Sequence, residues 1–281
     1  EPQEGGLEGR VMERSAVYFV SPGEVEVRVE PLAEPGPGQV WVRTRLSAIS
    51  PGTELLVYRG EFPRDLPVDA SIEALGGQFG YPLAYGYAAA GLVERLGPQV
   101  DPAWQGRRVF AFQPHADRFL ARTDELIPIP DDIPNEAAVF APNVETAVNF
   151  LMDGAPLIGE KVVVFGQGVV GLLTTALLAR FPLDRLAAVD RYPLRRRLAQ
   201  ALGAHAALDP GQPLVLEEVR RALELPGEDL QAEGADLVYE LSGAPPALDM
   251  ALAVAGFAGR VVVGSWYGSK PVELDLGGRF H

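Results

Sequence analysis

The segment that most constrains the fold of this chain is a glycine-rich turn between a strand-like run and a helix-like run. Residues 162–165 form a continuous apolar run, typical of a strand buried on both faces of a sheet. The run leads into Gly166-Gln167-Gly168-Val169-Val170-Gly171, after which a helical pattern continues to residue 180. Glycines at this spacing allow a tight turn, a close approach of a phosphate to the backbone, and close packing of helix on strand. The segment therefore predicts a dinucleotide site with the phosphates at the N-terminus of the helix.

A carboxylate after the next predicted strand, residues 185–190, fits the same interpretation. Asp190 stands where a side chain can hold the hydroxyl groups of the adenosine ribose, and such a carboxylate repels a 2′-phosphate. This favours NAD(H) as the cofactor. Arg191 follows directly, and three more arginines at 195–197 attract a 2′-phosphate, so NADP(H) remains open. The alternative is that Asp190 only caps the helix predicted from Pro193.

The second half of the chain alternates between strand-like and helix-like runs. The predicted helices are residues 136–153 (with Asn135 as N-cap), 169–180, 193–202, 214–225 and 245–255. The predicted strands are residues 162–165, 185–190, 236–241 and 260–264. This alternation indicates an α/β fold with a doubly wound parallel sheet. Ligands bind at the carboxyl ends of such strands, so Ser242, Gly264 and Ser265 are expected near the nicotinamide, unless they serve only as turn residues.

The first half has a different pattern. From about residue 16 to residue 129, short alternations of apolar and polar residues are separated by Pro and Gly, as in residues 25–29 and 40–44. Residues 34–38, Glu-Pro-Gly-Pro-Gly, read as a turn between two strands. The pattern predicts a β-rich domain with a small barrel or sandwich.

Composition excludes several classes of function. The net charge is −14, and no basic stripe is present to neutralise phosphates, so nucleic acid is not an expected partner. No apolar run reaches the roughly 18–20 residues that span a bilayer, and residues 1–11 lack the apolar core of a secretion signal. We therefore expect no membrane partner and a cytoplasmic location, with Met12 as a plausible start after a loose tail.

The chain has no cysteine and three histidines. The absence of cysteine excludes disulfides, thiolate nucleophiles, iron–sulfur clusters and cysteine-based zinc sites. With so few imidazoles, a histidine-rich metal site is difficult to assemble as well. We expect no metal in this protein.

Four segments carry a family resemblance. They are residues 48–54 (Ala-Ile-Ser-Pro-Gly-Thr-Glu), 81–91 (Tyr-Pro-Leu-Ala-Tyr-Gly-Tyr-Ala-Ala-Ala-Gly), 106–109 (Gly-Arg-Arg-Val) and 145–147 (Glu-Thr-Ala). Their order resembles the medium-chain dehydrogenase/reductase superfamily from Met12 onward, and the first two also resemble its bacteriochlorophyllide-dehydrogenase branch. The resemblance implies a GroES-like catalytic domain over 12–138, a Rossmann domain over 139–268, and the start of a return to the catalytic domain over 269–281. Family members continue for some tens of residues beyond this point, so we expect a C-terminally truncated chain.

The departures from the family concern zinc. Members with a catalytic zinc carry Cys where this chain has Ser50, and Gly-His-Glu where it has Gly86-Tyr87-Ala88. Neither Ser50 nor Tyr87 is a usual zinc ligand. The segment after Val109 has no room for the four-cysteine lobe that holds a structural zinc. The resemblance thus implies a zinc-free member, and an oxygen- and imidazole-based site with Glu54, His115 and Asp117 is the remaining alternative.

Without zinc, hydride exchange with a carbonyl still needs a proton partner. The candidate catalytic residues are Tyr87, Thr53 and Glu54 in one predicted loop region, Glu145 near a helix start, and His115. Each has a structural alternative: Tyr87 as an aromatic packed at the domain junction, Glu145 as a carboxylate favoured by the helix dipole, and His115 as a hydrogen-bonded core residue.

The leading hypothesis is a zinc-independent, NAD(P)-dependent oxidoreductase that transfers a hydride between nicotinamide and an alcohol or carbonyl, with the small-molecule substrate and cofactor in the cleft between the domains. One alternative is an NADPH-dependent quinone or enoyl reductase. Another is a dinucleotide-binding protein without catalysis. A homodimer or homotetramer of the full-length protein is also expected from the resemblance.

Overall fold

The computed structural model describes residues 12–69, 72–225, 234–274, 277, 278 and 280. They divide into two units, one containing residues 1–50 and 54–142 and the other residues 51–53 and 143–281. The residues expected to form the loose tail, 1–11, and His281 lie outside the described residues. Within the described part of the chain, no helix has the length and apolar character needed to cross a bilayer.

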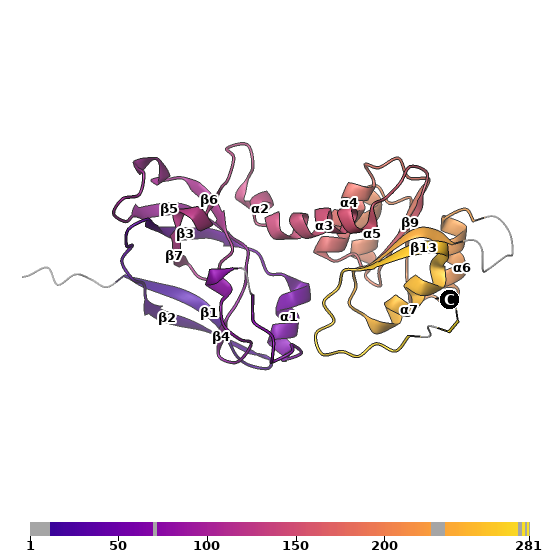
Figure 1. The fold of residues 1–281 in the computed structure, drawn as a ribbon, viewed down its shortest axis with the longest axis horizontal. Helices are drawn as coiled ribbons and strands as arrows, with labels where there is room; N and C mark the ends of the chain where they lie inside the picture. The colour runs from indigo at the N-terminus through magenta and orange to yellow at the C-terminus, as the bar shows by residue number, and fades with distance from the viewer. Residues whose placement is uncertain (1–11, 70–71, 226–233, 275–276, 279, 281) are drawn as a thin grey trace, which may run out of the picture. The chain divides into compact units, whose positions relative to one another are not determined.

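The first unit consists mainly of two antiparallel sheets (Figure 1). The smaller sheet has the order β2-β1-β4, formed by β1 (Glu13–Ser21), β2 (Glu24–Pro31) and β4 (Leu83–Ala84). The larger sheet has the order β7-β3-β5-β6-β8, formed by β3 (Gln39–Ser47), β5 (Ala89–Leu96), β6 (Arg108–Ala111), β7 (Arg118–Arg122) and β8 (Ile127–Pro128). The predicted β-rich domain and the turn at residues 34–38 are confirmed. Only residues 112–117 join β6 to β7, so this connection holds no lobe.

The prediction of a loop around Thr53 and Glu54 is wrong, because both residues lie in helix α1 (Pro51–Arg59). Pro51 suits the first turn, where its missing N–H has no intrahelical acceptor to lose. The Glu54 carboxylate reaches back to accept the backbone N–H of Ser50 at 2.7 Å, which satisfies an otherwise free donor at the helix start. Gly60, with φ 72°, ends the helix in the left-handed conformation.

The second unit is the predicted parallel sheet, in the order β11-β10-β9-β12-β13. Its strands are β9 (Lys161–Phe165), β10 (Arg185–Val189), β11 (Ala206–Leu208), β12 (Ala235–Glu240) and β13 (Ala255–Val263). Alternate side chains of β9 define its two faces. Val163 and Phe165 pack with α6 (Val215–Ala222) and α7 (Pro245–Val254), while Val162 and Val164 pack with α4 (Val169–Leu178) and α5 (Pro193–Ala201) (Figure 1). Helices therefore cover both faces, as a doubly wound sheet requires.

The prediction of a single helix over residues 136–153 with Asn135 as N-cap is wrong. Two helices occur, α2 (Asn135–Ala138) and α3 (Ala141–Gly154), and the N-cap of α2 is Pro134 rather than Asn135. Pro142 explains the break, because proline has no N–H to donate to the carbonyl four residues earlier and suits the first turn of a new helix.

Candidate functional site

The turn between β9 and α4 has the geometry that each of its glycines was expected to provide. Gly166 has φ +87°, and a Cβ there would lie 2.5 Å from the backbone nitrogen of Ser242. A Cβ on Gly171 would overlap the carbonyl oxygen of Gly166. At Gly168, by contrast, a Cβ would meet no protein atom within 4 Å. The turn is thus closed on its inner side and open at Gly168, which begins α4 as its N-cap.

The first backbone N–H groups of α4 precede the first intrahelical hydrogen bond of the helix. Val169, Val170 and Gly171 occupy the first turn of the helix, and the N–H of Leu172 is the first to bond back, to the Gly168 carbonyl at 2.9 Å. The preceding N–H groups have no intrahelical acceptor and carry the positive end of the helix dipole. The residues present therefore fit the pyrophosphate of a dinucleotide.

Asp190 is tied to this turn. It follows β10, is 6% exposed, and its Oδ2 accepts the backbone N–H of Gln167 at 2.7 Å. Its Oδ1 accepts the N–H of Tyr192, also at 2.7 Å. The Gln167 side chain lies beneath the turn, where it donates to the Val164 carbonyl and accepts from Thr175. Asp190 therefore has a structural role at the place where a ribose-binding carboxylate is expected, and its remaining lone pairs leave the binding role open.

Two arginines flank Asp190 on the exposed aromatic ring of Tyr192. The guanidinium carbons of Arg191 and Arg195 lie 4.6 and 4.7 Å from the ring centroid. Arg195 also lies 3.5 Å from Asp190 Oδ2. Arg196 is engaged elsewhere, with the Asp190 carbonyl and with Asp209. The local arrangement thus brings a carboxylate and two cations together.

The loops after β12 and β13 meet at a buried carboxylate that the sequence analysis missed. Glu240, fully buried at the end of β12, accepts the N–H and the hydroxyl of Ser242 and the hydroxyl of Tyr267. Burial, followed by this hydrogen bond and the charge of Glu240, raises the pKa of Tyr267. Ser265 donates to the Glu240 carbonyl at 3.3 Å, and Gly264 leaves space for the ring of Phe150. Ser242, Gly264 and Ser265 therefore belong to one packed region. Glu240 could have been identified from the sequence as a charged residue at the end of an apolar strand.

In the first unit, two of the predicted catalytic residues come together. His115 Nε2 lies 2.9 Å from Glu54 Oε2, and both side chains are buried. His115 Nδ1 lies 2.9 Å from Ser47 Oγ, a partner that the sequence analysis did not identify. Gly86 makes room for the ring, because a Cβ there would lie 2.7 Å from Nε2 of His115.

The other predicted catalytic residues, Tyr87, Thr53 and Glu145, do not join the Glu54–His115 pair. Tyr87 is half-buried and packs edge-on against Tyr85, with ring centroids 6.3 Å apart, so its aromatic packing role is present. Burial, then the neighbouring Tyr87 and Glu54, raises the pKa of Tyr85. Thr53 precedes Glu54 in α1, and Glu145 is exposed near the start of α3. None of these three side chains is hydrogen-bonded to the Glu54–His115 pair among the described residues.

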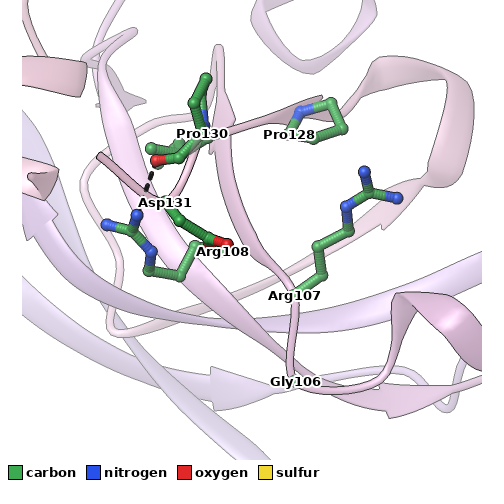
Figure 2. Close-up of a pocket in the computed structure, with 7 residues that line it drawn as sticks. Gly106, Arg107, Arg108, Pro128, Pro130 and Asp131 are labelled. Atoms are coloured by element: carbon green, nitrogen blue, oxygen red, sulfur yellow. Dashed lines mark hydrogen bonds between the residues drawn. The ribbon is translucent and has the colours of Figure 1, made fainter. Parts of the chain in front are cut away.

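A hollow of about 390 Å³ in the first unit contains none of the predicted site residues (Figure 2). Arg108 on its wall donates to the carbonyl oxygens of Pro130 and Ile133, at 2.7 and 2.8 Å. Arg107 lies over the ring of Trp104. Both arginines are therefore used in structural contacts. It is lined by Gly106, Arg107, Arg108, Pro128, Ile129, Pro130 and Asp131.

Comparisons with known proteins agree with this geometry. A family model described as zinc-binding dehydrogenase matches residues 169–278. The chain is 26% identical over 280 residues to an L-threonine 3-dehydrogenase of Anaeromyxobacter dehalogenans, a match that covers 86% of this chain and 74% of that protein.

Two solved structures share the fold. A putative zinc-binding dehydrogenase from Sinorhizobium meliloti bound to NADP is 22% identical, with a TM-score of 0.74, over 96% of this chain and 82% of the other. The 2R,3R-butanediol dehydrogenase of Bacillus subtilis is 21% identical, with a TM-score of 0.75, over 94% and 80%. The chain therefore shares the fold of these dehydrogenases, and its residues 169–278 are similar to the zinc-binding dehydrogenase family.

Proposed function

We propose that this protein transfers a hydride between a nicotinamide dinucleotide and a small alcohol or carbonyl compound, without zinc. The observation that carries the proposal is the turn that is closed at Gly166 and Gly171 and open at Gly168. That turn, the first residues of α4 and Asp190 would hold the pyrophosphate and adenosine ribose of the cofactor. When bound, the nicotinamide supplies the hydride chemistry, and the protein orients the reactants and manages the proton.

NAD(H) is the cofactor that Asp190 favours, since a carboxylate repels a 2′-phosphate. The contacts also support use of NADP(H). Both oxygens of Asp190 accept backbone N–H groups, and Arg195 lies 3.5 Å from Oδ2, so part of the carboxylate charge is compensated locally. Arg191 and Arg195 would be the groups that meet a 2′-phosphate.

Zinc independence rests on the available donors. Cysteine is absent from the chain, and the resemblance to the medium-chain dehydrogenase/reductase superfamily implies that Ser50 and Tyr87 replace ligands of its zinc-binding members. Among the described residues, no three His, Asp or Glu side chains are grouped in a way that could hold a metal ion. Asp117 is bonded to the backbone N–H of Ser15 and to Arg118, so it does not complete a site with Glu54 and His115. These donors do not fit the tetrahedral zinc site of the superfamily.

We assign the transfer of the proton to the Glu54–His115 pair. Tyr87, which follows Gly86 in the chain, is a further candidate proton donor. Thr53 and Glu145 stay candidates for contacts with the substrate. Small alcohols are the first compounds to test, because the similar proteins are named for L-threonine and butanediol. Since no group of three metal-binding side chains occurs among the residues that the structure describes, a second candidate is NADPH-dependent reduction of quinones or enones, which needs no metal to polarise a carbonyl.

The proposed function is tested by titrating the protein with NADH and NADPH while following protein fluorescence, in the wild type, Asp190→Ala and the double variant Arg191→Ala/Arg195→Ala. We expect NADH to bind more tightly than NADPH, Asp190→Ala to weaken NADH most, and the double variant to weaken NADPH most. Thermal unfolding of each variant serves as the folding control. A folded wild type that binds neither nucleotide contradicts the proposal.

Turnover is then measured with L-threonine, 2,3-butanediol, benzyl alcohol, a quinone and an enone, before and after dialysis against a strong chelator. Oxidation of an alcohol that survives chelation supports the main proposal. Reduction of the quinone or enone alone supports the second candidate. Activity lost on chelation and restored by zinc overturns zinc independence, and nucleotide binding without any turnover supports a non-catalytic binding protein.

A further inference from the structure

A continuous chain of hydrogen bonds runs through the first unit from Ser47 to Glu54. Ser47 Oγ lies 2.9 Å from His115 Nδ1, and His115 Nε2 lies 2.9 Å from Glu54 Oε2. Glu54 Oε1 accepts the backbone N–H of Ser50. His115 is 8% exposed and Glu54 is 4% exposed, whereas Ser47, at the end of β3, is half-buried. The two ring nitrogens are both engaged, and Ser47 is the more accessible residue of the two that end the chain.

The chemistry of the three groups fixes the direction of each hydrogen bond. A carboxylate only accepts, so Nε2 of His115 donates to Glu54, and Nδ1 of the neutral ring is left as an acceptor. Ser47 must then donate its hydroxyl proton to Nδ1. If the ring gains that proton, Nδ1 becomes a donor and Ser47 Oγ becomes free to take a proton from outside. A serine can do both because a hydroxyl donates and accepts.

Glu54 stabilises the positive charge that the buried His115 ring gains with a second proton. Its carboxylate faces Nε2 and stabilises the positive ring, as the acidic residue does in hydrolytic triads. The ring is also held in position by the backbone of its own segment: the His115 carbonyl accepts the N–H of Val17 at 2.9 Å, and Gly86 removes the Cβ that would displace the ring. The imidazole is therefore oriented between a proton entrance and a compensating charge.

We propose that Ser47 carries the proton between the bound substrate and His115, with Glu54 as the positioning residue that stabilises the charged ring. This inference rests on the proposed oxidoreductase function. In alcohol oxidation a bound oxidised nicotinamide would supply the acceptor for the hydride that leaves the substrate carbon as the C=O bond forms. The substrate hydroxyl proton passes to Ser47 Oγ, the Ser47 proton passes to His115 Nδ1, and the ring later returns it to water by the same route. Carbonyl reduction runs in reverse.

The proton route is testable without knowledge of the substrate, because the chain has only three histidines. The measurement is nitrogen-15 NMR of histidine-labelled protein, wild type and Ser47→Ala, with His115→Asn to assign the signal. We expect the wild-type His115 ring to carry its proton on Nε2, and the rate at which Nδ1 takes up and releases a proton, followed as exchange broadening of the Nδ1 signal, to fall in Ser47→Ala. Ser47→Thr keeps a hydroxyl and is expected to restore exchange. Ser21→Ala, which removes an exposed hydroxyl bonded to Glu24, is the matched control.

Exchange in Ser47→Ala that is unchanged or faster overturns the route through Ser47. A ring protonated on Nδ1 alone overturns the assigned directions. With a substrate found in the panel above, Ser47→Ala is expected to lower the rate of the chemical step by about 10²-fold or more, the usual scale of general acid–base catalysis, and Ser47→Thr to recover part of it. NADH affinity is expected to stay unchanged in both variants. Loss of NADH binding in the wild type would instead count against the proposed function, so the two failures are distinguishable.

Discussion

A Cβ atom on residue 171 would overlap the carbonyl oxygen of Gly166, whereas a Cβ on residue 168 would meet no protein atom within 4 Å. The two glycines therefore serve different purposes within one turn. Gly171 allows the helix to pack on the strand, and Gly168 leaves room for something that is not protein.

Alanine substitutions separate these purposes. Gly171→Ala is expected to destabilise the protein by about 2 kcal/mol or more, because the overlap is with backbone that cannot yield cheaply. Gly168→Ala is expected to fold with near wild-type stability and to bind NADH at least about tenfold more weakly, which corresponds to about 1.4 kcal/mol. Denaturant unfolding and fluorescence titration of both variants provide the measurements. Unimpaired NADH binding by Gly168→Ala would show that the pyrophosphate lies elsewhere.

The Glu160–Arg260 pair supports the second unit at the opposite end of the strands. Arg260 Nη2 donates to both oxygens of Glu160, at 2.7 and 2.8 Å, and its Nε donates to the Gly154 carbonyl. Glu160 is 9% exposed and also accepts the N–H of Leu157. Arg260→Ala should lower the free energy of unfolding by about 1–3 kcal/mol, because it leaves a mostly buried carboxylate without its cation.

Asp124→Asn is the control for that variant, since Asp124 pairs with Arg122 at an exposed position. Its expected effect on the free energy of unfolding is small, because water screens an exposed ion pair. Equal effects of the two substitutions, measured by urea unfolding, would contradict the importance assigned to burial.

The hydroxyl of Tyr239 offers a stabilising substitution. Tyr239 is fully buried in β12, and its hydroxyl, which faces Gly154, has no hydrogen-bond partner among the described residues. A buried polar group without a partner costs about 1–3 kcal/mol, so Tyr239→Phe should raise the free energy of unfolding by up to this amount. Calorimetric melting of the variant is the measurement, and a lowered melting temperature would reveal a partner that the hydroxyl needs.

Five of the eight tyrosines have a raised pKa, and the three with the largest increase give the protein a characteristic response to alkali. Burial raises the pKa of Tyr85, Tyr239 and Tyr267 above the ordinary value of 10.0, and Glu240 adds to the effect at Tyr267. The folded state therefore keeps protons that the unfolded chain releases, so the stability these groups contribute is intact below pH 10 and is lost as the pH rises above it.

We accordingly expect part of the tyrosinate absorbance to appear only when the protein unfolds in alkali, with near-ultraviolet absorbance and circular dichroism recorded on the same samples. In Tyr267→Phe this late portion should shrink. A complete tyrosinate signal from a protein that is still folded would show that these phenols are accessible.

The parallel sheet was predictable because its determinants are local. Residues 162–165 and the glycines that follow specify a strand, a turn and a helix within a few positions, and the strand–helix alternation needs no knowledge of distant contacts. Helix α1 was missed because its start depends on the Glu54 side chain bonding back to Ser50, which the residues around Pro51 and Gly52 do not suggest.

The chain of hydrogen bonds from Ser47 through His115 to Glu54 was only partly predictable, for a different reason. Glu54 and His115 were candidates by residue type, but they are 61 positions apart, and no local pattern pairs them. Ser47 was overlooked because an isolated serine at a strand end is usually unremarkable. Glu240 was missed since its importance arises from Ser242 and Tyr267, which only the folded loops bring to it.

The bond between Asp190 and the backbone of Gln167 has a consequence for how this protein can change its cofactor over evolution. A replacement at position 190 that accommodates a 2′-phosphate also removes the acceptor of the Gln167 N–H from the turn that we propose for the pyrophosphate. Selection for a new preference therefore meets a fitness barrier at Asp190. The exposed Arg191 and the half-buried Arg195 are not part of the sheet core, so changes of cofactor choice among relatives should follow those two positions while the aspartate persists.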